Sequence, residues 1–153
     1  MLFRSLGFTP DTTGPICRIR KDDVLIDIMP SDPNILGFAN RWAESAIKHA
    51  QVMRLDDNHD IRVTDAPHFL AMKVEAFIGR GEGDYLLSHD LEDVVSLVAG
   101  RETLVSEMGH APRELQEFVA DFVRSNFANL SDAIQAHLPP DEASQAQIGR
   151  AHV

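Results

Sequence analysis

Residues 67–83, PHFLAMKVEAFIGRGEG, decide how this chain folds. The apolar side chains of this segment recur at the spacing of one helix face: Phe69, Leu70, Val74 and Phe77. This spacing predicts an amphipathic helix. Pro67 suits its first turn, where a missing N–H costs nothing, and the glycine-rich end of the segment stops it. From Pro67 onward the apolar period is 3.6 residues, whereas upstream it is two.

More helices are expected after this segment. Ser88 predicts an N-cap, Asp90 lies in the first turn, where a carboxylate favours the helix dipole, and Gly100 closes the helix. Further helices are predicted over residues 101–108, 112–127 and 130–136 and after Asp141.

Upstream, residues 16–20 and 24–29 predict a β-hairpin. The strand over 24–29 is apolar on both faces, so we expect it to be central in its sheet. Residues 51–55 and 61–64 predict a second hairpin, and residues 41–47 a short helix. Strands followed by helices indicate an α+β fold, with a small mixed or antiparallel sheet and helices packed on it.

Composition narrows the class of protein. The 153 residues suffice for one domain, and 44% hydrophobic with 25% charged residues is typical of a globular chain. No apolar run reaches the roughly 18 residues of a membrane-spanning helix. The formal charge of −10 argues against a general polyanion binder. One cysteine, Cys17, excludes an internal disulfide and a cysteine-based zinc site, so we expect a cytoplasmic protein.

Both ends match the translation of a sequencing adapter. Residues 2–5 correspond to CTC TTC CGA TCT, and residues 148–153 to ATC GGA AGA GCA CAC GTC. We therefore expect residues 1–5 and 148–153 to be adapter-derived and the chain between them to be an interior piece of a longer gene. Within that piece, residues 6–65 would be the sheet and residues 66–147 the helical portion of the same domain.

Asp27 is the first candidate site residue. It lies within the apolar run Leu25-Ile26-Asp27-Ile28-Met29, where an unpaired carboxylate is costly to bury. Such a carboxylate has a cation partner, which is a metal ion, an arginine or a lysine. The plainer alternatives are a position at the rim of the sheet or a structural pair with an arginine.

Two cations and two carboxylates form the second candidate. Lys73 and Arg80 are seven residues apart, on one face of their helix, and Asp90 and Asp93 share a face at the start of the next. The four side chains predict a salt-bridge network, the commoner outcome on helical surfaces. Alternatively, Lys73 contacts a nucleotide phosphate while Asp90 orients the surroundings.

Three other sequence features do not indicate a catalytic or binding site. Residues 79–83 lack the Gly-Lys-Ser/Thr ending of a P-loop. The seven histidines show no zinc-binding spacing. Ser88, His89 and Asp90 are sequence neighbours, which is not how a hydrolase triad is assembled in space.

Several of these segments resemble one family. The quoted motifs are Ile26-Asp27-Ile28, Lys73-x-Glu75-Ala76-Phe77-x-x-Arg80 and Ser88-His89-Asp90-Leu91-x-Asp93. Together they resemble the C-terminal two-thirds of bacterial nucleotidyltransferase-like proteins, the group that contains the AbiEii abortive-infection toxins. The resemblance covers nearly all of residues 6–147, and the lysine helix with the aspartates after it is its most specific part.

The resemblance implies a fold and a set of roles. It implies a nucleotidyltransferase-like sheet in which three carboxylates bind two Mg²⁺ ions that hold a nucleoside triphosphate. Asp27 matches the third of these carboxylates. Lys73 and Asp90 match later motifs associated with nucleotide binding and catalysis, and Arg80 would help to attract the triphosphate.

The sequence departs from the family pattern in two places. The Gly-Ser turn and the first two carboxylates, on an Asp-x-Asp strand, do not occur in it, as expected if the chain begins downstream of them. His89 stands where many relatives have a basic residue, and a neutral imidazole is a weaker phosphate partner. We therefore expect the chain by itself to bind triphosphate weakly, to transfer nothing, and to associate through uncovered apolar surface.

Two functions follow as expectations. The first is an enzyme that uses magnesium to transfer a nucleoside monophosphate from a nucleoside triphosphate to an acceptor hydroxyl on RNA, a protein or a small molecule. It would serve in a toxin–antitoxin or phage-defence system, with an antitoxin protein as a possible partner and no membrane involved. The second is a nucleotidyltransferase-fold module that binds or interacts without catalysis.

Overall fold

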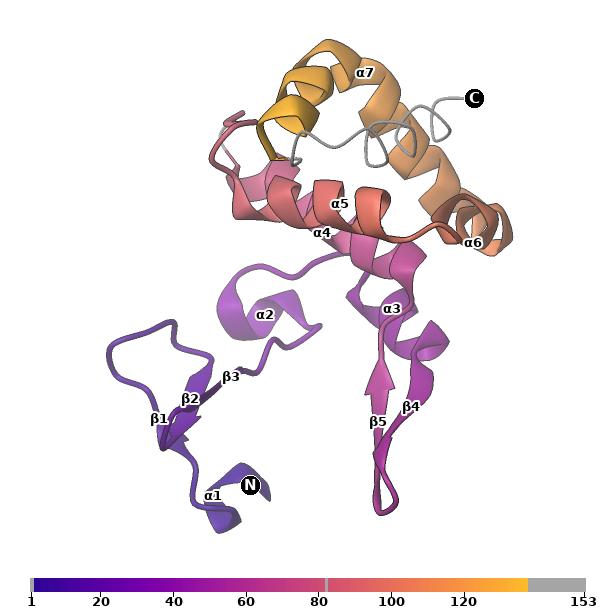
Figure 1. Ribbon diagram of the computed structural model, residues 1–153. Coiled ribbons are helices and arrows are strands. Elements are labelled where there is room, and N and C mark those ends of the chain that lie inside the picture. The colour runs from indigo at the N-terminus through magenta and orange to yellow at the C-terminus, as the bar shows by residue number, and fades with distance from the viewer. Residues whose placement is uncertain (1, 82, 138–153) are drawn as a thin grey trace. The chain divides into compact units, whose positions relative to one another are not determined.

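A computed structural model describes residues 2–81 and 83–137. The chain divides into two compact units, Met1–Ala39 and Asn40–Val153, each of which is described separately below. The division falls within the predicted sheet portion, residues 6–65. The observed architecture is a mixed α+β arrangement of small antiparallel sheets and a helical C-terminal part (Figure 1). Its coarse class therefore agrees with the prediction.

The first unit is built around a three-stranded antiparallel sheet. The sheet consists of β1 (Thr9–Pro10), β2 (Arg18–Lys21) and β3 (Val24–Asp27), in the order β1-β2-β3. A short helix, α1 (Leu2–Ser5), precedes it, and α2 (Pro33–Leu36) follows it. The predicted hairpin is thereby confirmed.

The expectation that the second strand of this hairpin is central was wrong. Among the described residues β3 pairs only with β2, so it is an edge strand, and Val24 and Leu25 are each about half exposed. A strand with apolar residues on both faces is central only if further strands and helices cover it. Such covering depends on contacts with distant parts of a chain, which the strand's own pattern does not report.

The second unit begins with α3 (Ala43–His49) and a two-stranded hairpin, β4 (Gln51–Asp56) and β5 (His59–Val63). Both were expected at these places. The turn of the hairpin is held by Asp56, whose carboxylate accepts a hydrogen bond from the backbone N–H of Asn58.

Four more helices lie within the described residues of this unit, and the first two begin with side-chain caps. They are α4 (Ala66–Arg80), α5 (His89–Gly100), α6 (Leu104–His110) and α7 (Arg113–His137). Asp65 caps α4 by accepting from the N–H of His68, and Ser88 caps α5 as predicted. The predicted helices over 112–127 and 130–136 are one helix with a kink at Asn126. The helix expected after Asp141 lies outside the described residues.

The core of the second unit lies where α4, α5 and α7 pack together (Figure 1). The stripe predicted for α4 supplies its centre, with Leu70, Val74 and Phe77 at most 5% exposed. Leu91 and Leu115 pack against it and are fully buried. No helix within residues 2–81 and 83–137 is both long and apolar enough to cross a membrane.

Candidate functional site

A cluster of four charged side chains joins α4 to α5. The guanidinium of Arg80 donates two hydrogen bonds to Asp90, Nε to Oδ2 at 2.8 Å and Nη2 to Oδ1 at 2.9 Å. The ammonium of Lys73 lies 3.2 Å from Asp90 Oδ1 and 2.5 Å from Asp93 Oδ2. The structure therefore brings together all four residues that the sequence singled out on these helices, as the predicted salt-bridge network.

We call Lys73, Arg80, Asp90 and Asp93 the cation cluster, and Asp90 is its centre. Its side chain is 8% exposed, whereas those of Lys73 and Arg80 are 26% and 68% exposed. Hydrogen bonds from Arg80 hold the pKa of Asp90 below its ordinary value, with help from Lys73 and against the effect of burial. Burial pulls the pKa of Lys73 down, but hydrogen bonds to Asp93 and Asp90 outweigh it and raise that pKa. Lys73, Arg80 and Asp90 are consequently charged at neutral pH.

In the connection between α4 and α5, Gly81 and Tyr85 pack closely against Phe77. Gly81 closes α4, and a Cβ there would lie 2.5 Å from the carbonyl oxygen and from a ring carbon of Phe77, so a side chain at this position forces a shift. Tyr85 packs edge-on against Phe77, and its hydroxyl donates to Asn126 at 2.6 Å. Tyr85 thus ties this connection to α4 and α7.

Glu75, another residue of the same motif, has a structural role. Its carboxylate lies 2.7 Å from Arg41, whose guanidinium also lies over the rings of Trp42 and Phe118. This contact ties the segment before α3 to α4 and α7.

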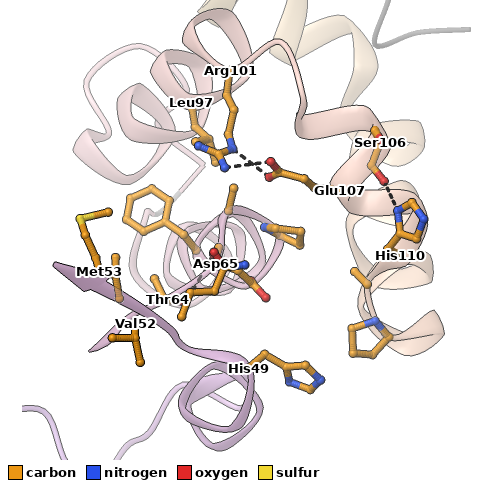
Figure 2. Close-up of a pocket in the computed structure, with 17 residues that line it drawn as sticks. His49, Val52, Met53, Thr64, Asp65, Leu97, Arg101, Ser106, Glu107 and His110 are labelled. Atoms are coloured by element: carbon orange, nitrogen blue, oxygen red, sulfur yellow. Dashed lines mark hydrogen bonds and ion pairs between the residues drawn. The ribbon is translucent and has the colours of Figure 1, made fainter. Parts of the chain in front are cut away.

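A cavity of about 610 Å³ opens beside the N-terminal half of α4 (Figure 2). Figure 2 shows Val52 and Met53 on one side of it and Ser106 and His110 on the other. Arg101 and Glu107 form a bidentate ion pair across its top in that view, with both N···O distances 2.8 Å. The sequence gives no local signal for this cavity, because its walls come from α3, β4, β5, α4, α5 and α6.

Asp27 lies at the end of β3, in the first unit. Both of its carboxylate oxygens accept from the guanidinium of Arg18, at 2.7 and 2.9 Å, and its side chain is 40% exposed. The bonds from Arg18 lower the pKa of Asp27, against the effect of burial. This is the structural pair with an arginine that the sequence left open as an alternative.

The surroundings of Asp27 do not fit a magnesium ion. Magnesium prefers several oxygen ligands, and here a cation already occupies both oxygens of the carboxylate. Within the described part of the chain, no three His, Cys, Asp or Glu side chains form a group that could hold a metal ion. The role that the resemblance gives to Asp27 stays a prediction.

The second unit contains a buried hydrogen-bond relay of Asp65, His68 and Ser45 that the sequence alone did not indicate. His68 is 0% exposed, its Nδ1 lies 2.7 Å from Asp65 Oδ1, and its Nε2 lies 2.8 Å from Ser45 Oγ. Because a carboxylate only accepts, Nδ1 carries a proton and donates to Asp65. Asp65 is also the N-cap of α4, so the relay ties α3 to the start of α4. Ser45 lies 23 residues before His68 in the sequence, so only the i,i+3 spacing of Asp65 and His68 gives a local signal.

Comparison of the chain with protein-family models, with curated proteins and with solved structures found no match.

Proposed function

We propose that this chain forms the nucleotide-binding part of a nucleotidyltransferase, which transfers a nucleoside monophosphate from a nucleoside triphosphate to an acceptor hydroxyl. One observation carries the proposal: the nearly buried carboxylate of Asp90 fixes both Lys73 and Arg80 on the same face of α4. A triphosphate is a row of anionic oxygens, and cations held in place beforehand stabilise the charge that shifts along it during transfer.

Lys73 would accept a phosphate by exchanging one of its partners. Its shortest contact is to Asp93, whose side chain is 47% exposed, and an ion pair with an exposed carboxylate is worth little in water. A phosphate oxygen can therefore replace Asp93 at low cost while Asp90 keeps the ammonium in place. Arg80 is mostly exposed and can add a phosphate contact while its Nε and Nη2 stay on Asp90.

The proposal gives distinct roles to these residues. Lys73 and Arg80 bind phosphate, and Asp90 is a positioning residue that acts through both of them. Magnesium would arrive with the triphosphate and neutralise part of its charge. Because the environment of Asp27 does not fit the metal, no step is assigned to that residue.

A second candidate is a module that binds a partner, such as an antitoxin protein, without catalysis. The charge of the cluster favours this candidate. Lys73 and Arg80 both face carboxylates, so with Asp90 and Asp93 the four side chains carry no net charge. A neutral cluster attracts a triphosphate less strongly than two unpaired cations would.

A transfer assay separates the two candidates. The resemblance requires a Gly-Ser turn and an Asp-x-Asp strand, which do not occur in these 153 residues, so the assay uses the chain joined to a segment that supplies them. The fusion is incubated with labelled nucleoside triphosphates, magnesium and total RNA or cell extract. Lys73→Gln should abolish transfer, and Lys48→Gln, at an exposed lysine of α3, should not. Absence of transfer from every form, or transfer that is indifferent to Lys73→Gln, favours the non-catalytic module.

A further inference from the structure

The cavity and the cation cluster meet along one face of α4 and α5. Phe69 lines the cavity and lies one turn before Lys73, whose Nζ is 5.7 Å from the centre of the Phe69 ring. On α5, Leu97 lines the cavity and lies one turn after Asp93, the second partner of Lys73. A molecule in the cavity therefore lies one helical turn from Lys73.

The lining of the cavity suits a flat, uncharged ring better than a phosphate. Its apolar lining includes Val52, Met53, Pro67, Phe69 and Leu97. Its formally charged side chains are Asp65, Arg101 and Glu107, which together carry one excess negative charge. That charge repels phosphate, whereas the exposed aromatic and apolar surface favours stacking.

Hydrogen-bonding groups also line the cavity. His110 lines the cavity, and its Nδ1 lies 2.8 Å from the backbone carbonyl of Ser106, which only accepts, so Nδ1 carries a proton. Thr64 adds a hydroxyl to the lining. Polar groups beside apolar walls can orient a small ring-bearing ligand, and a volume of about 610 Å³ lies within the usual range of such sites.

We infer that the cavity is the nucleoside subsite of the proposed site, an inference that rests on the proposed function. The base stacks on Phe69 in the cavity, and the triphosphate extends along α4 to Lys73 and then Arg80. The negative lining of the cavity and the cations one turn away give the ligand a single orientation, with its ring inside the cavity and its phosphates outside. The ligand class is a nucleoside triphosphate, with the base as a source of affinity that inorganic tripolyphosphate does not have.

The test measures binding to the 153-residue chain by saturation-transfer NMR and by titration. The ligands are ATP, CTP and inorganic tripolyphosphate, each with magnesium. Saturation should reach the base protons of ATP and CTP more strongly than the ribose protons. Phe69→Leu should lower ATP affinity about tenfold, because the base loses its stacking contact, and leave tripolyphosphate affinity unchanged, because Asp90 still positions Lys73. Ile78→Ala, at an exposed residue of the same helix, is the matched control and should change neither affinity.

A second variant tests the cavity independently if Phe69→Leu fails to fold. Ser106 is exposed at the cavity, so Ser106→Trp fills the cavity without disturbing the core. This variant should also weaken ATP binding and spare tripolyphosphate. Equal binding of ATP and tripolyphosphate, with no effect of Phe69→Leu or Ser106→Trp, would overturn the nucleoside subsite while leaving the proposed function intact. Absence of binding by all three ligands would instead overturn the proposed function, and the subsite with it.

Discussion

Arg80 and Asp90, on two successive helices, form a bidentate ion pair with N···O distances of 2.8 and 2.9 Å. Asp90 also accepts a hydrogen bond from Lys73 on the same helix as Arg80, so one carboxylate positions two cations. Such a carboxylate stabilises the packing of α4 against α5. It also fixes the direction in which both cations face, which is the property a phosphate site needs.

Asp90→Asn should destabilise the protein. The amide keeps the shape of the side chain but leaves two cations without their shared carboxylate, and the loss should be about 2 kcal/mol in the free energy of unfolding. Asp93→Asn is the matched control. Its side chain is half exposed and pairs with Lys73, so its effect should be a small fraction of this. Urea denaturation of both variants measures the difference, and equal effects would show that Asp90 has no special role.

The contribution of Asp90 should disappear in acid. Its pKa is lower in the folded chain than its ordinary value of 3.8, so the folded state binds this proton less tightly than the unfolded state does. The stability it provides is therefore complete above about pH 5 and is lost as the pH falls below about 4, through the folded pKa. The gap in unfolding free energy between the wild type and Asp90→Asn should close over that range. A gap that stays constant down to pH 3 would contradict the ion-pair account.

Two glycines at the end of α4 should respond to alanine in opposite directions. At Gly81 a Cβ meets the backbone and ring of Phe77 at 2.5 Å, so Gly81→Ala should cost about 1–3 kcal/mol. At Gly79 nothing lies within 4 Å of the added Cβ, so Gly79→Ala should stabilise the helix by up to about 1 kcal/mol. Thermal melts of the two variants check both signs. Similar stability of the two would show that the connection to α5 does not depend on the close approach at Gly81.

Magnesium alone should not stabilise the chain through Asp27. The carboxylate is paired with Arg18, and an exposed pair of this kind adds little to stability. Asp27→Asn should therefore leave the melting temperature nearly unchanged, as should Asp60→Asn, which breaks the similar pair with Arg54 in the other hairpin. The measurement is the melting temperature with and without magnesium. A rise with magnesium that Asp27→Asn removes would establish Asp27 as a metal ligand and contradict its assignment to a structural pair.

The sequence predicted the cation cluster because local rules position its members. Lys73 and Arg80 share a face through helical spacing, Asp90 and Asp93 do so as well, and the Ser88 cap sets where α5 begins. Only the contact between the two cations and the two carboxylates depends on tertiary packing, and their opposite charges predicted that contact.

Features that depend on distant contacts could not be predicted in this way. The apolar pattern of β3 indicated burial, but whether other strands cover an apolar strand is decided elsewhere in a chain. The relay from Asp65 through His68 to Ser45 joins two helices separated by a hairpin, and the cavity has walls from six elements. No short segment of the sequence contains all the residues of the relay or of the cavity.

Equilibrium binding of magnesium–ATP to the chain, followed by isothermal titration, tests the central claim most directly. Lys73 is the residue on which the proposed phosphate site depends, and Lys48, exposed on α3, provides a control with the same change of charge. The account predicts saturable binding that Lys73→Gln weakens at least about tenfold and Lys48→Gln leaves unchanged, since a charge-assisted contact to phosphate is lost only in the first. Equal affinities for the wild type, Lys73→Gln and Lys48→Gln, or no binding to the wild type, would contradict it.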